Sequence, residues 1–413
     1  MDNLNYKYND FFKIVSILII TLIPITLTTG PFLADFLLAI LSIFFIINCY
    51  KENYWYWLKN PLFIFLLVFY FYILSRTFYL FYIFNLPLDS HIFYFRYLIY
   101  FSAISFFISR YQVILKYLGY SLIIIILFVT IDAFIQFFFN NDIFGIDKKG
   151  DRLSGVFGEE LILGSYISRL ILLCYFFLYG KLIFKKSSFI LPLFIILTSI
   201  IIFLTGERTA FLIFCFSILI IFILQRNKIH ILKSMLLIII PIILIALLND
   251  NSQNRMIKET LNQLGLSSTN NTSFLQSSYG KIYSSSFDLF KESPLIGVGP
   301  KNYENFCLNS KKVNSKINCG VHPHNYLIQT LTETGLLGFF IFYSFYFYLI
   351  FIFFRYCQMN KKENLIYIGS LGSIIVFYLP FLPSGNFYNG WLNTITFFNL
   401  GIFNIYFQKV IRN

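Results

Sequence analysis

Residues 112–138 read QVILKYLGYSLIIIILFVTIDAFIQFF, an apolar run in which Lys116 and Asp132 are the only charged side chains. A helix rises about 1.5 Å per residue, so this run is long enough to cross a hydrocarbon layer of about 30 Å. A helix also satisfies its own backbone hydrogen bonds, which lipid cannot do. The run therefore predicts a transmembrane helix.

Similar runs recur along the whole chain, which is 58% hydrophobic and 12% charged. Soluble domains have about 45–50% apolar and about 25% charged residues, so no single aqueous core could bury this surface. The sequence predicts an all-α membrane protein with about twelve transmembrane helices, at 11–29, 31–48, 61–84, 92–108, 112–138, 161–179, 189–205, 210–225, 232–248, 325–354, 364–382 and 391–408. The first run precedes no small-residue cleavage site, so we interpret it as a retained helix and not a signal peptide.

The distribution of Lys and Arg predicts the orientation, since basic residues gather in short cytoplasmic loops. Short outer loops would hold only Lys148, Lys149, Arg152 and Arg208. Both termini are therefore predicted to be cytoplasmic, in a multi-pass protein. The formal net charge of +13 bears on partners only through its position, and no nucleic-acid partner is expected. The basic residues on the predicted cytoplasmic side are Lys7, Lys13, Lys51, Lys59, Arg110, Lys116, Lys181, Lys185, Lys186, Arg226, Lys228, Lys233, Arg355, Lys361, Lys362, Lys409 and Arg412.

This topology divides the chain into three parts. Residues 1–248 carry the first nine predicted spans, residues 249–323 form a periplasmic loop, and residues 324–413 carry the last three spans. A second outer segment covers residues 140–160.

Aromatic residues in the large loop indicate an amphipathic helix. Tyr279, Tyr283, Phe287 and Phe290 follow at steps of 4, 4 and 3, and Pro294 ends the pattern. Two interpretations remain open. The helix lies on the membrane surface or caps the bundle, or it forms a lid over a site.

Two of the six cysteines, Cys307 and Cys319, lie in this loop. In an oxidising compartment they could pair and close a short basic turn with Lys311, Lys312 and Lys316. Such a bridge would stabilise the protein by roughly 3 kcal/mol on the chain-entropy model. The alternative is two free thiols.

Two of the four histidines stand together in His322-Pro323-His324-Asn325, where the loop re-enters the membrane. An imidazole there can accept a proton from a hydroxyl near neutral pH, as a general base does. Pro323 and the lack of nearby cysteines or paired carboxylates argue against a zinc site. A third interpretation is a plain helix start, capped by Asn325 or His324, with no catalytic role.

Further charges stand at positions where lipid exposure would be costly. In the tight hairpin Gly206-Glu207-Arg208-Thr209-Ala210, Arg208 either pairs with Glu207 or presents two parallel donors to phosphate. No nucleotide-binding motif appears, so the energy for a reaction would arrive in the substrate. Four ionisable residues within the spans are expected to face the bundle interior, in salt bridges or in a polar cavity: Arg76, Arg96, Asp132 and Arg169.

One set of motifs resembles a known family. Ser293-Pro-Leu-Ile-Gly-Val-Gly-Pro300 is followed by His324-Asn325, nine residues, and Gly335-Leu-Leu-Gly338. This pattern resembles the O-antigen ligase and O-antigen polymerase superfamily. Further matches are Arg152-Leu-Ser-Gly-Val-Phe-Gly158, Gly164-Ser165 and the Arg208 hairpin.

The resemblance implies a bacterial inner-membrane glycosyltransferase of about twelve helices that needs no metal or other cofactor. Its periplasmic site would move a glycan from undecaprenyl diphosphate to a hydroxyl acceptor. That acceptor is a lipid A core sugar in a ligase and a lipid-linked repeat in a polymerase, and the His-Asn to Gly-Leu-Leu-Gly pattern favours the ligase. The implied partners are the lipid-linked glycan, its acceptor and membrane lipid. A transporter of lipid-linked glycans and a non-catalytic scaffold are the alternatives from other classes.

Carried over residue by residue, the family's catalytic histidine falls on His324 and its hairpin arginine on Arg208. The chain departs from the family at Tyr279-Gly280-Lys281, where members often have Ser-Gly-Arg. Lys281 keeps the positive charge that would bind diphosphate but loses the planar fork of an arginine. Arg152 or Arg255 would then supply the second bidentate contact. The expected supporting residues are His322, Asn325 and Glu207.

Overall fold

The computed structural model describes residues 2–180, 190–225, 228–264, 266, 273–310, 319–357 and 364–412. These ranges are helical with connecting loops, and within them the structure forms isolated β-bridges but no β-strand. The predicted all-α fold class is confirmed. Several predicted charges lie outside the described residues: Lys181, Lys185, Lys186, Arg226, Lys311, Lys312, Lys316, Lys361 and Lys362.

Every predicted apolar run contains a helix. Before the large loop these are α1 (Asp2–Thr26), α2 (Pro31–Glu52), α3 (Pro61–Phe84), α4 (Phe95–Arg110), α5 (Val113–Phe139), α6 (Leu163–Tyr179), α7 (Ile190–Leu204), α8 (Arg208–Leu224) and α9 (Lys228–Leu248). After the loop they are α14 (Tyr326–Cys357), α15 (Leu365–Phe377) and α16 (Gly390–Arg412).

Five helical segments in the described part of the chain are long and apolar enough to cross a membrane: α2, α3, His91–Arg110, α5 and α14. Shorter apolar helices occur in α6, α7, α8, α9 and α15. The chain is therefore a membrane protein. The number of twelve spans and the predicted orientation stay predictions.

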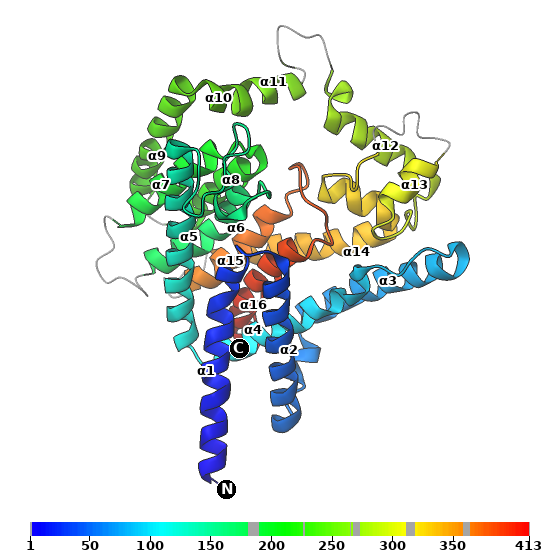
Figure 1. Ribbon diagram of the computed structural model, residues 1–413. Coiled ribbons are helices and arrows are strands. Elements are labelled where there is room, and N and C mark those ends of the chain that lie inside the picture. The colour runs from blue at the N-terminus through cyan, green and yellow to red at the C-terminus, as the bar shows by residue number, and fades with distance from the viewer. Residues whose placement is uncertain are drawn as a thin grey trace.

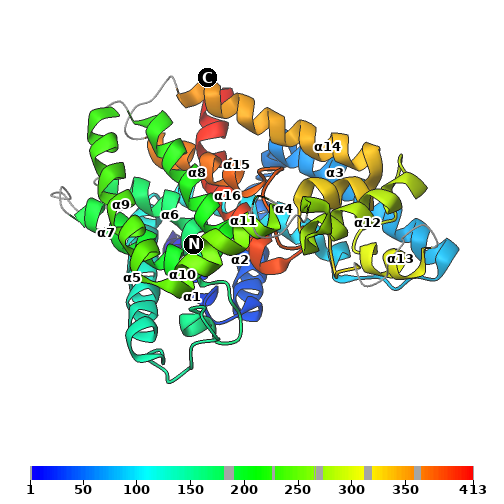
Figure 2. The same cartoon turned by 90° about the horizontal axis from the view of Figure 1, so that it is seen from above.

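The loop between α9 and α14 folds into short helices. They are α10 (Asp250–Gln253), the π-helical turn η4 (Asn254–Lys258), α11 (Glu259–Gln263), the 3-10 turn η5 (Phe274–Gln276), α12 (Ser278–Glu292) and α13 (Tyr303–Asn309). In Figure 1, α10 and α11 lie at the top of the molecule, and α12 and α13 lie on its right above α3 and α14. Figure 2 shows the same separation from above.

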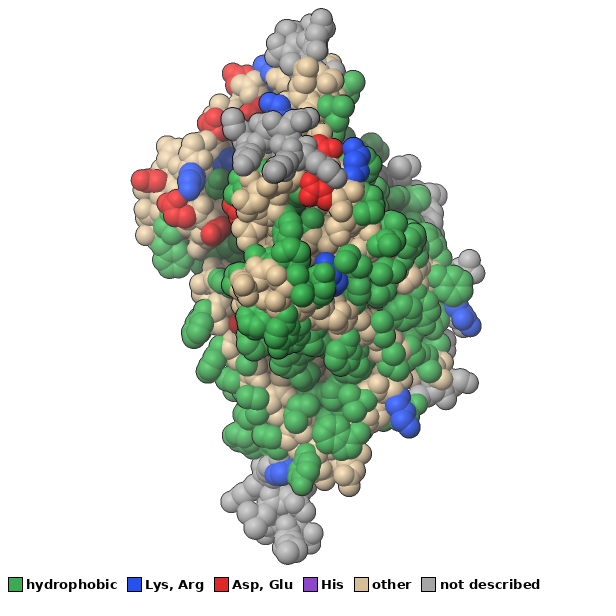
Figure 3. Space-filling model, turned by 90° about the vertical axis from the view of Figure 1, so that its right-hand side faces the viewer, with side chains coloured by type: hydrophobic (Ala, Val, Ile, Leu, Met, Phe, Trp, Pro, Cys, Tyr) green, Lys and Arg blue, Asp and Glu red, His purple; other side chains and the backbone are tan. Residues whose placement is uncertain are grey.

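The centre of the bundle is built by helices that are buried along most of their length. α16 packs against α4 and α15, and α15 packs in turn against α6. Nearly all side chains of α6 are buried. Outer helices instead expose large apolar residues such as Phe71 and Ile124. On the face seen in Figure 3 the middle is largely apolar and acidic side chains gather at the top, as expected for a lipid-facing surface.

Asparagines define several helix ends. Asn60 accepts a hydrogen bond from Leu62 N at 2.9 Å and so caps α3, with Pro61 at the first helical position. Asn53 and Asn85 end α2 and α3 in the left-handed conformation, a position that glycine usually takes.

The structure bears out most of the expectations for buried charges. Arg76, Asp132 and Arg169 are buried. Arg96 is half-buried instead, since its side chain reaches Asp35 in an ion pair of 2.9 Å at the bundle edge.

The predicted disulfide between Cys307 and Cys319 is present, with the two Cα atoms 5.7 Å apart. It ties α13 to the segment that leads into His322. The bridge therefore fixes the loop close to the candidate site.

Candidate functional site

Three arginines from three separate segments meet beside the turn at Gly206. Arg152 comes from the loop after α5, Arg208 begins α8, and Arg255 lies in η4. A Cβ atom added to Gly206 would lie 3.1 Å from Arg255 Cγ and 3.7 Å from Arg152 Cγ. Arg208 interacts electrostatically with Arg152 and with Arg255. We call Arg152, Arg208 and Arg255 the arginine cluster.

Within the described residues, each member of the cluster makes a hydrogen bond or an ion pair that holds its side chain. Arg208 Nη1 donates to Gln263 Oε1 at 2.8 Å, and Arg255 Nη1 pairs with Glu259 at 2.8 Å. Arg152 Nη2 donates to Leu161 O at 3.3 Å. The buried Nε atoms of Arg152 and Arg255 have no hydrogen-bond partner within the described structure. Such unpaired donors are costly unless a ligand uses them.

The pKa of Arg152 reflects the repulsion between the positive charges of the cluster. Burial lowers this pKa, and the charges of Arg255 and Arg208 lower it further. Glu207 acts in the opposite direction. The cluster is therefore a place where an anion would be stabilised.

Glu207 binds the start of α6 and does not simply pair with Arg208. Its carboxylate accepts hydrogen bonds from Gly164 N at 2.7 Å and Ser165 N at 3.1 Å, at the first turn of α6. A carboxylate is favourable at a helix N-terminus, where backbone N–H groups lack partners. Burial raises the pKa of Glu207, and these hydrogen bonds and Arg152 oppose that rise. None of the ion pairs in the described structure joins Glu207 to Arg208.

The segment that carries Arg152 is folded by two side chains of α5. Gln136 Oε1 accepts hydrogen bonds from Ser154 N at 2.9 Å and Gly155 N at 2.8 Å. Asp132 Oδ1 accepts one from Ile143 N at 2.9 Å. Gly155 has a φ of +51°, and a Cβ atom there would lie 2.6 Å from Asp132 Oδ2. This position therefore requires glycine.

The two histidines lie at the start of α14. Their ring centroids are 3.9 Å apart, with His322 buried and His324 partly exposed. Asn325 caps the helix, since its Oδ1 accepts a hydrogen bond from Ile328 N at 3.0 Å. Its Nδ2 donates to Pro380 O and Leu382 O. The interpretation of Asn325 as a helix cap is confirmed.

His324 itself adopts the left-handed conformation, with φ of 56°. Its carbonyl accepts a hydrogen bond from Ser384 N at 2.8 Å, so the backbone is fixed from the α15–α16 connection. Burial lowers the pKa of His324 below its ordinary value and that of His322 to about 4. Both rings are therefore neutral at pH 7, and His324 is the more accessible proton acceptor.

Tyr279 links the histidines to the arginine cluster. Its ring centroid lies 6.0 Å from that of His324, and it interacts electrostatically with Arg152 and Arg208. The predicted amphipathic helix is confirmed, since α12 contains all four of the predicted aromatic positions. Tyr279 stands on its first turn. The aromatic residues of α12 lie in two environments. Tyr279 and Tyr283 are partly buried near the histidines, whereas Phe287 is exposed. The aromatic pattern was visible in the sequence, but the contact with His324 was not.

Lys281 was the third predicted diphosphate contact, and its role stays a prediction. It is exposed on α12, and none of the ion pairs among the described residues includes it. The cluster contains Arg255 instead. Sequence reasoning placed Arg255 only as a possible substitute.

A row of buried polar side chains runs from Asn325 along one face of α14, at i, i+4 and i+8. Gln329 Oε1 accepts a hydrogen bond from Phe387 N at 2.9 Å, and its Nε2 donates to Glu333 Oε2 at 3.2 Å. Glu333 Oε2 also accepts one from Lys301 N at 3.2 Å. We call Asn325, Gln329 and Glu333 the polar stripe; it joins the α15–α16 connection to the large loop.

The family-like glycines form a different structure, the glycine clasp, made by residues 293–300 and 332–338. Val298 N and Gly299 N donate to Thr332 O and Glu333 O, at 3.0 and 2.8 Å. In the other direction, the N–H groups of residues 336 and 337 donate to the carbonyls of residues 294 and 295, at 2.9 and 3.1 Å. Backbone hydrogen bonds thus join the two segments directly.

Two glycines make this approach possible. A Cβ atom on Gly297 or Gly335 would lie 2.4 Å from the opposing carbonyl carbon, and both residues have positive φ, 68° and 64°. Gly335 also kinks α14. Arg76 secures the clasp from α3, since its Nε and Nη2 donate to the carbonyls of residues 296 and 297 at 3.1 and 3.0 Å.

The fold and the site define a polytopic helical membrane protein that brings basic groups and neutral histidines together at one end. Residues 193–343 match the family model described as O-antigen ligase. This segment includes Arg208, Arg255, both histidines and the glycine clasp, whereas Arg152 lies before it. No curated protein matches the chain. The match confirms the resemblance to the O-antigen ligase superfamily and supports a membrane enzyme of the ligase or polymerase type.

Proposed function

We propose that the chain is an O-antigen ligase-like glycosyltransferase of the bacterial inner membrane, with both termini cytoplasmic. It moves a glycan from undecaprenyl diphosphate to a sugar hydroxyl of the lipid A core, on the periplasmic face. The observation that carries this proposal is the contact of Tyr279 with His324 on one side and its electrostatic link to the arginine cluster on the other. A base and an anion site are thereby adjacent, as transfer from a diphosphate requires.

In the proposed reaction, His324 accepts the proton of the acceptor hydroxyl. The acceptor oxygen forms a bond to the anomeric carbon while the bond between that carbon and the diphosphate oxygen breaks. The bonding electrons leave with undecaprenyl diphosphate. A diphosphate is already a good leaving group, so no general acid is required.

The arginine cluster would stabilise the charge that develops on the leaving diphosphate. Arg208 provides the bidentate grip, and Arg152 and Arg255 provide donors that have no partner in the described structure. Arg255 thereby takes the role of the family arginine that Lys281 replaces. Lys281 would contribute a single point charge from its exposed position on α12. His322 shapes the site beside His324, and Asn325 and Glu207 hold the helices in place.

A polymerase is the second candidate, because it would use the same donor site with a lipid-linked repeat as acceptor. Deletion of the gene separates the two. Loss of attached polymer while lipid-linked polymer accumulates indicates a ligase, and lipopolysaccharide carrying a single repeat indicates a polymerase. A transporter of lipid-linked glycans would give no transfer when purified protein is mixed with donor and acceptor.

A further inference from the structure

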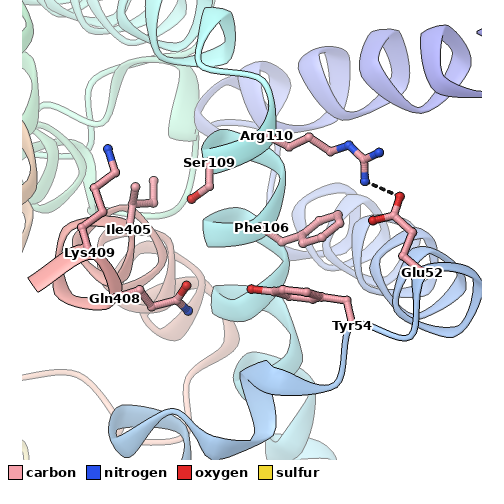
Figure 4. A pocket seen from close by; sticks show the side chains of 8 residues that line it. All are labelled: Glu52, Tyr54, Phe106, Ser109, Arg110, Ile405, Gln408 and Lys409. Carbon is pink, nitrogen blue, oxygen red and sulfur yellow. Dashed lines mark hydrogen bonds and ion pairs between the residues drawn. The ribbon is translucent and has the colours of Figure 1, made fainter. Parts of the chain in front are cut away.

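A recess lined by polar and charged side chains lies at the bundle end away from α10 and α11. It is formed where α2 and α4 end and where α16 nears its C-terminus, and its volume is about 390 Å³. Figure 4 shows side chains from these segments around it. We call it the basal recess. Its lining residues are Glu52, Tyr54, Phe106, Ser109, Arg110, Ile405, Gln408 and Lys409.

The lining has more positive than negative charge. Arg110 and Lys409 are cations, and Glu52, paired with Arg110, is the one carboxylate among the residues that line it. The Arg110 guanidinium also lies 5.8 Å from the centre of the Phe106 ring, which helps to hold it in place. A smaller recess of about 110 Å³ shares Gln408 and adds Lys59. The pair of recesses therefore suits an anion.

Neutral hydrogen-bonding groups accompany these charges. Ser109, Tyr54 and Gln408 line the same recess, so both hydroxyl and amide groups border it. Such groups match the phosphate and the glycerol hydroxyls of a lipid head group better than a simple ion.

The surroundings place the recess at the level of lipid head groups. Tyr50, Trp55 and Tyr56 are exposed and stand close in sequence to the lining residues Glu52 and Tyr54. Tyrosine and tryptophan favour the boundary between lipid and water. Ile43 and Ile47 continue the exposed surface along α2 as an apolar face. Acyl chains could lie along this face while the head group occupies the recess.

We propose that the basal recess binds the phosphate-bearing head group of an anionic phospholipid. The positive charges of Arg110 and Lys409 attract the phosphate, and the neutral groups contact the glycerol. Basic pockets between membrane helices recognise anionic head groups in this way. The proposal does not depend on the glycan transfer.

The test uses the full-length protein in nanodiscs of phosphatidylcholine, with phosphatidylglycerol added in increasing amounts. Native mass spectrometry measures the phosphatidylglycerol that stays bound. The double variant Arg110→Gln/Lys409→Gln should bind about 25-fold more weakly, because each cation contributes about fivefold. The control Lys116→Gln removes an exposed cation that does not line the recess and should leave binding unchanged.

A second variant keeps the test informative if the double variant folds poorly. Glu52→Gln removes the carboxylate that competes for Arg110 and should strengthen phosphatidylglycerol binding about fivefold. Equal binding by the natural protein, the double variant and Glu52→Gln would overturn the proposal. Displacement of the bound lipid by inorganic phosphate would also overturn it, since the ligand would then be a soluble phosphate.

Discussion

The candidate site, which consists of the arginine cluster and the two histidines, contains residues that resemble the family, and so does the glycine clasp. The two regions differ in how their polar groups are used. In the clasp, backbone donors and acceptors pair with each other, and the motif glycines provide close approach. In the site, the Nε atoms of Arg152 and Arg255 and the Nδ1 atom of His322 stay without partners in the described structure. Buried polar groups are normally satisfied, so unused donors mark the place where a ligand is expected. The most recognisable pattern is thus architectural, and the proposed chemistry lies beside it.

The sharpest test of this contrast is His324→Ala. If His324 is the base, the variant should lose about 10²- to 10⁴-fold in the rate of glycan transfer, since it lacks the proton acceptor. The thermal unfolding midpoint of the detergent-purified protein should change little, because His324 is partly exposed. An assay with undecaprenyl-diphosphate-linked glycan and purified acceptor measures the rate. Near-normal transfer would remove the proposed mechanism.

Arg208→Lys tests the anion grip. An ammonium keeps the charge but cannot form two parallel hydrogen bonds, so transfer should fall about 10²-fold in the same assay. Arg96→Lys serves as a control, because Arg96 pairs with Asp35 away from the cluster and transfer should persist. A silent Arg208→Lys variant would mean that Arg208 contributes structure alone.

Gly335→Ala tests the clasp. It should mainly lower the stability of the protein, whereas the two site variants should mainly lower the transfer rate. The new Cβ atom would lie 2.4 Å from the carbonyl carbon of residue 295, at a φ of +64°. Strained backbone of this kind costs about 1–3 kcal/mol before the overlap is counted. Gly150→Ala is the matched control, because Gly150 has a φ of +60° with no heavy atom within 4 Å of the added Cβ. Thermal unfolding should distinguish them, and equal midpoints would contradict the role of the clasp.

The helices could be predicted from the sequence because long apolar runs have one stable form in lipid. The position of Arg255 could not be predicted, since it depends on a π-helical turn that no periodicity signals. Glu207 was expected near Arg208, yet it caps a helix that begins more than forty residues earlier, a contact set by packing. Lys281 was expected in the site because of its place in the motif. The direction in which α12 presents its side chains decides that contact, and a motif does not contain this information.

The pH dependence of transfer gives the smallest expected effect and separates the two histidines. Burial lowers the pKa of His324 below its ordinary value of 6.5, so the neutral base persists to lower pH than a free imidazole would. The transfer rate should therefore fall as the pH decreases, with a midpoint below 6.5. His322, whose pKa is about 4, stays neutral over most of this range, so His322→Gln should leave that midpoint in place while changing the rate modestly. If the midpoint moved in His322→Gln, the proton acceptor would be His322 or the coupled pair, and the accessible ring of His324 would not be the base.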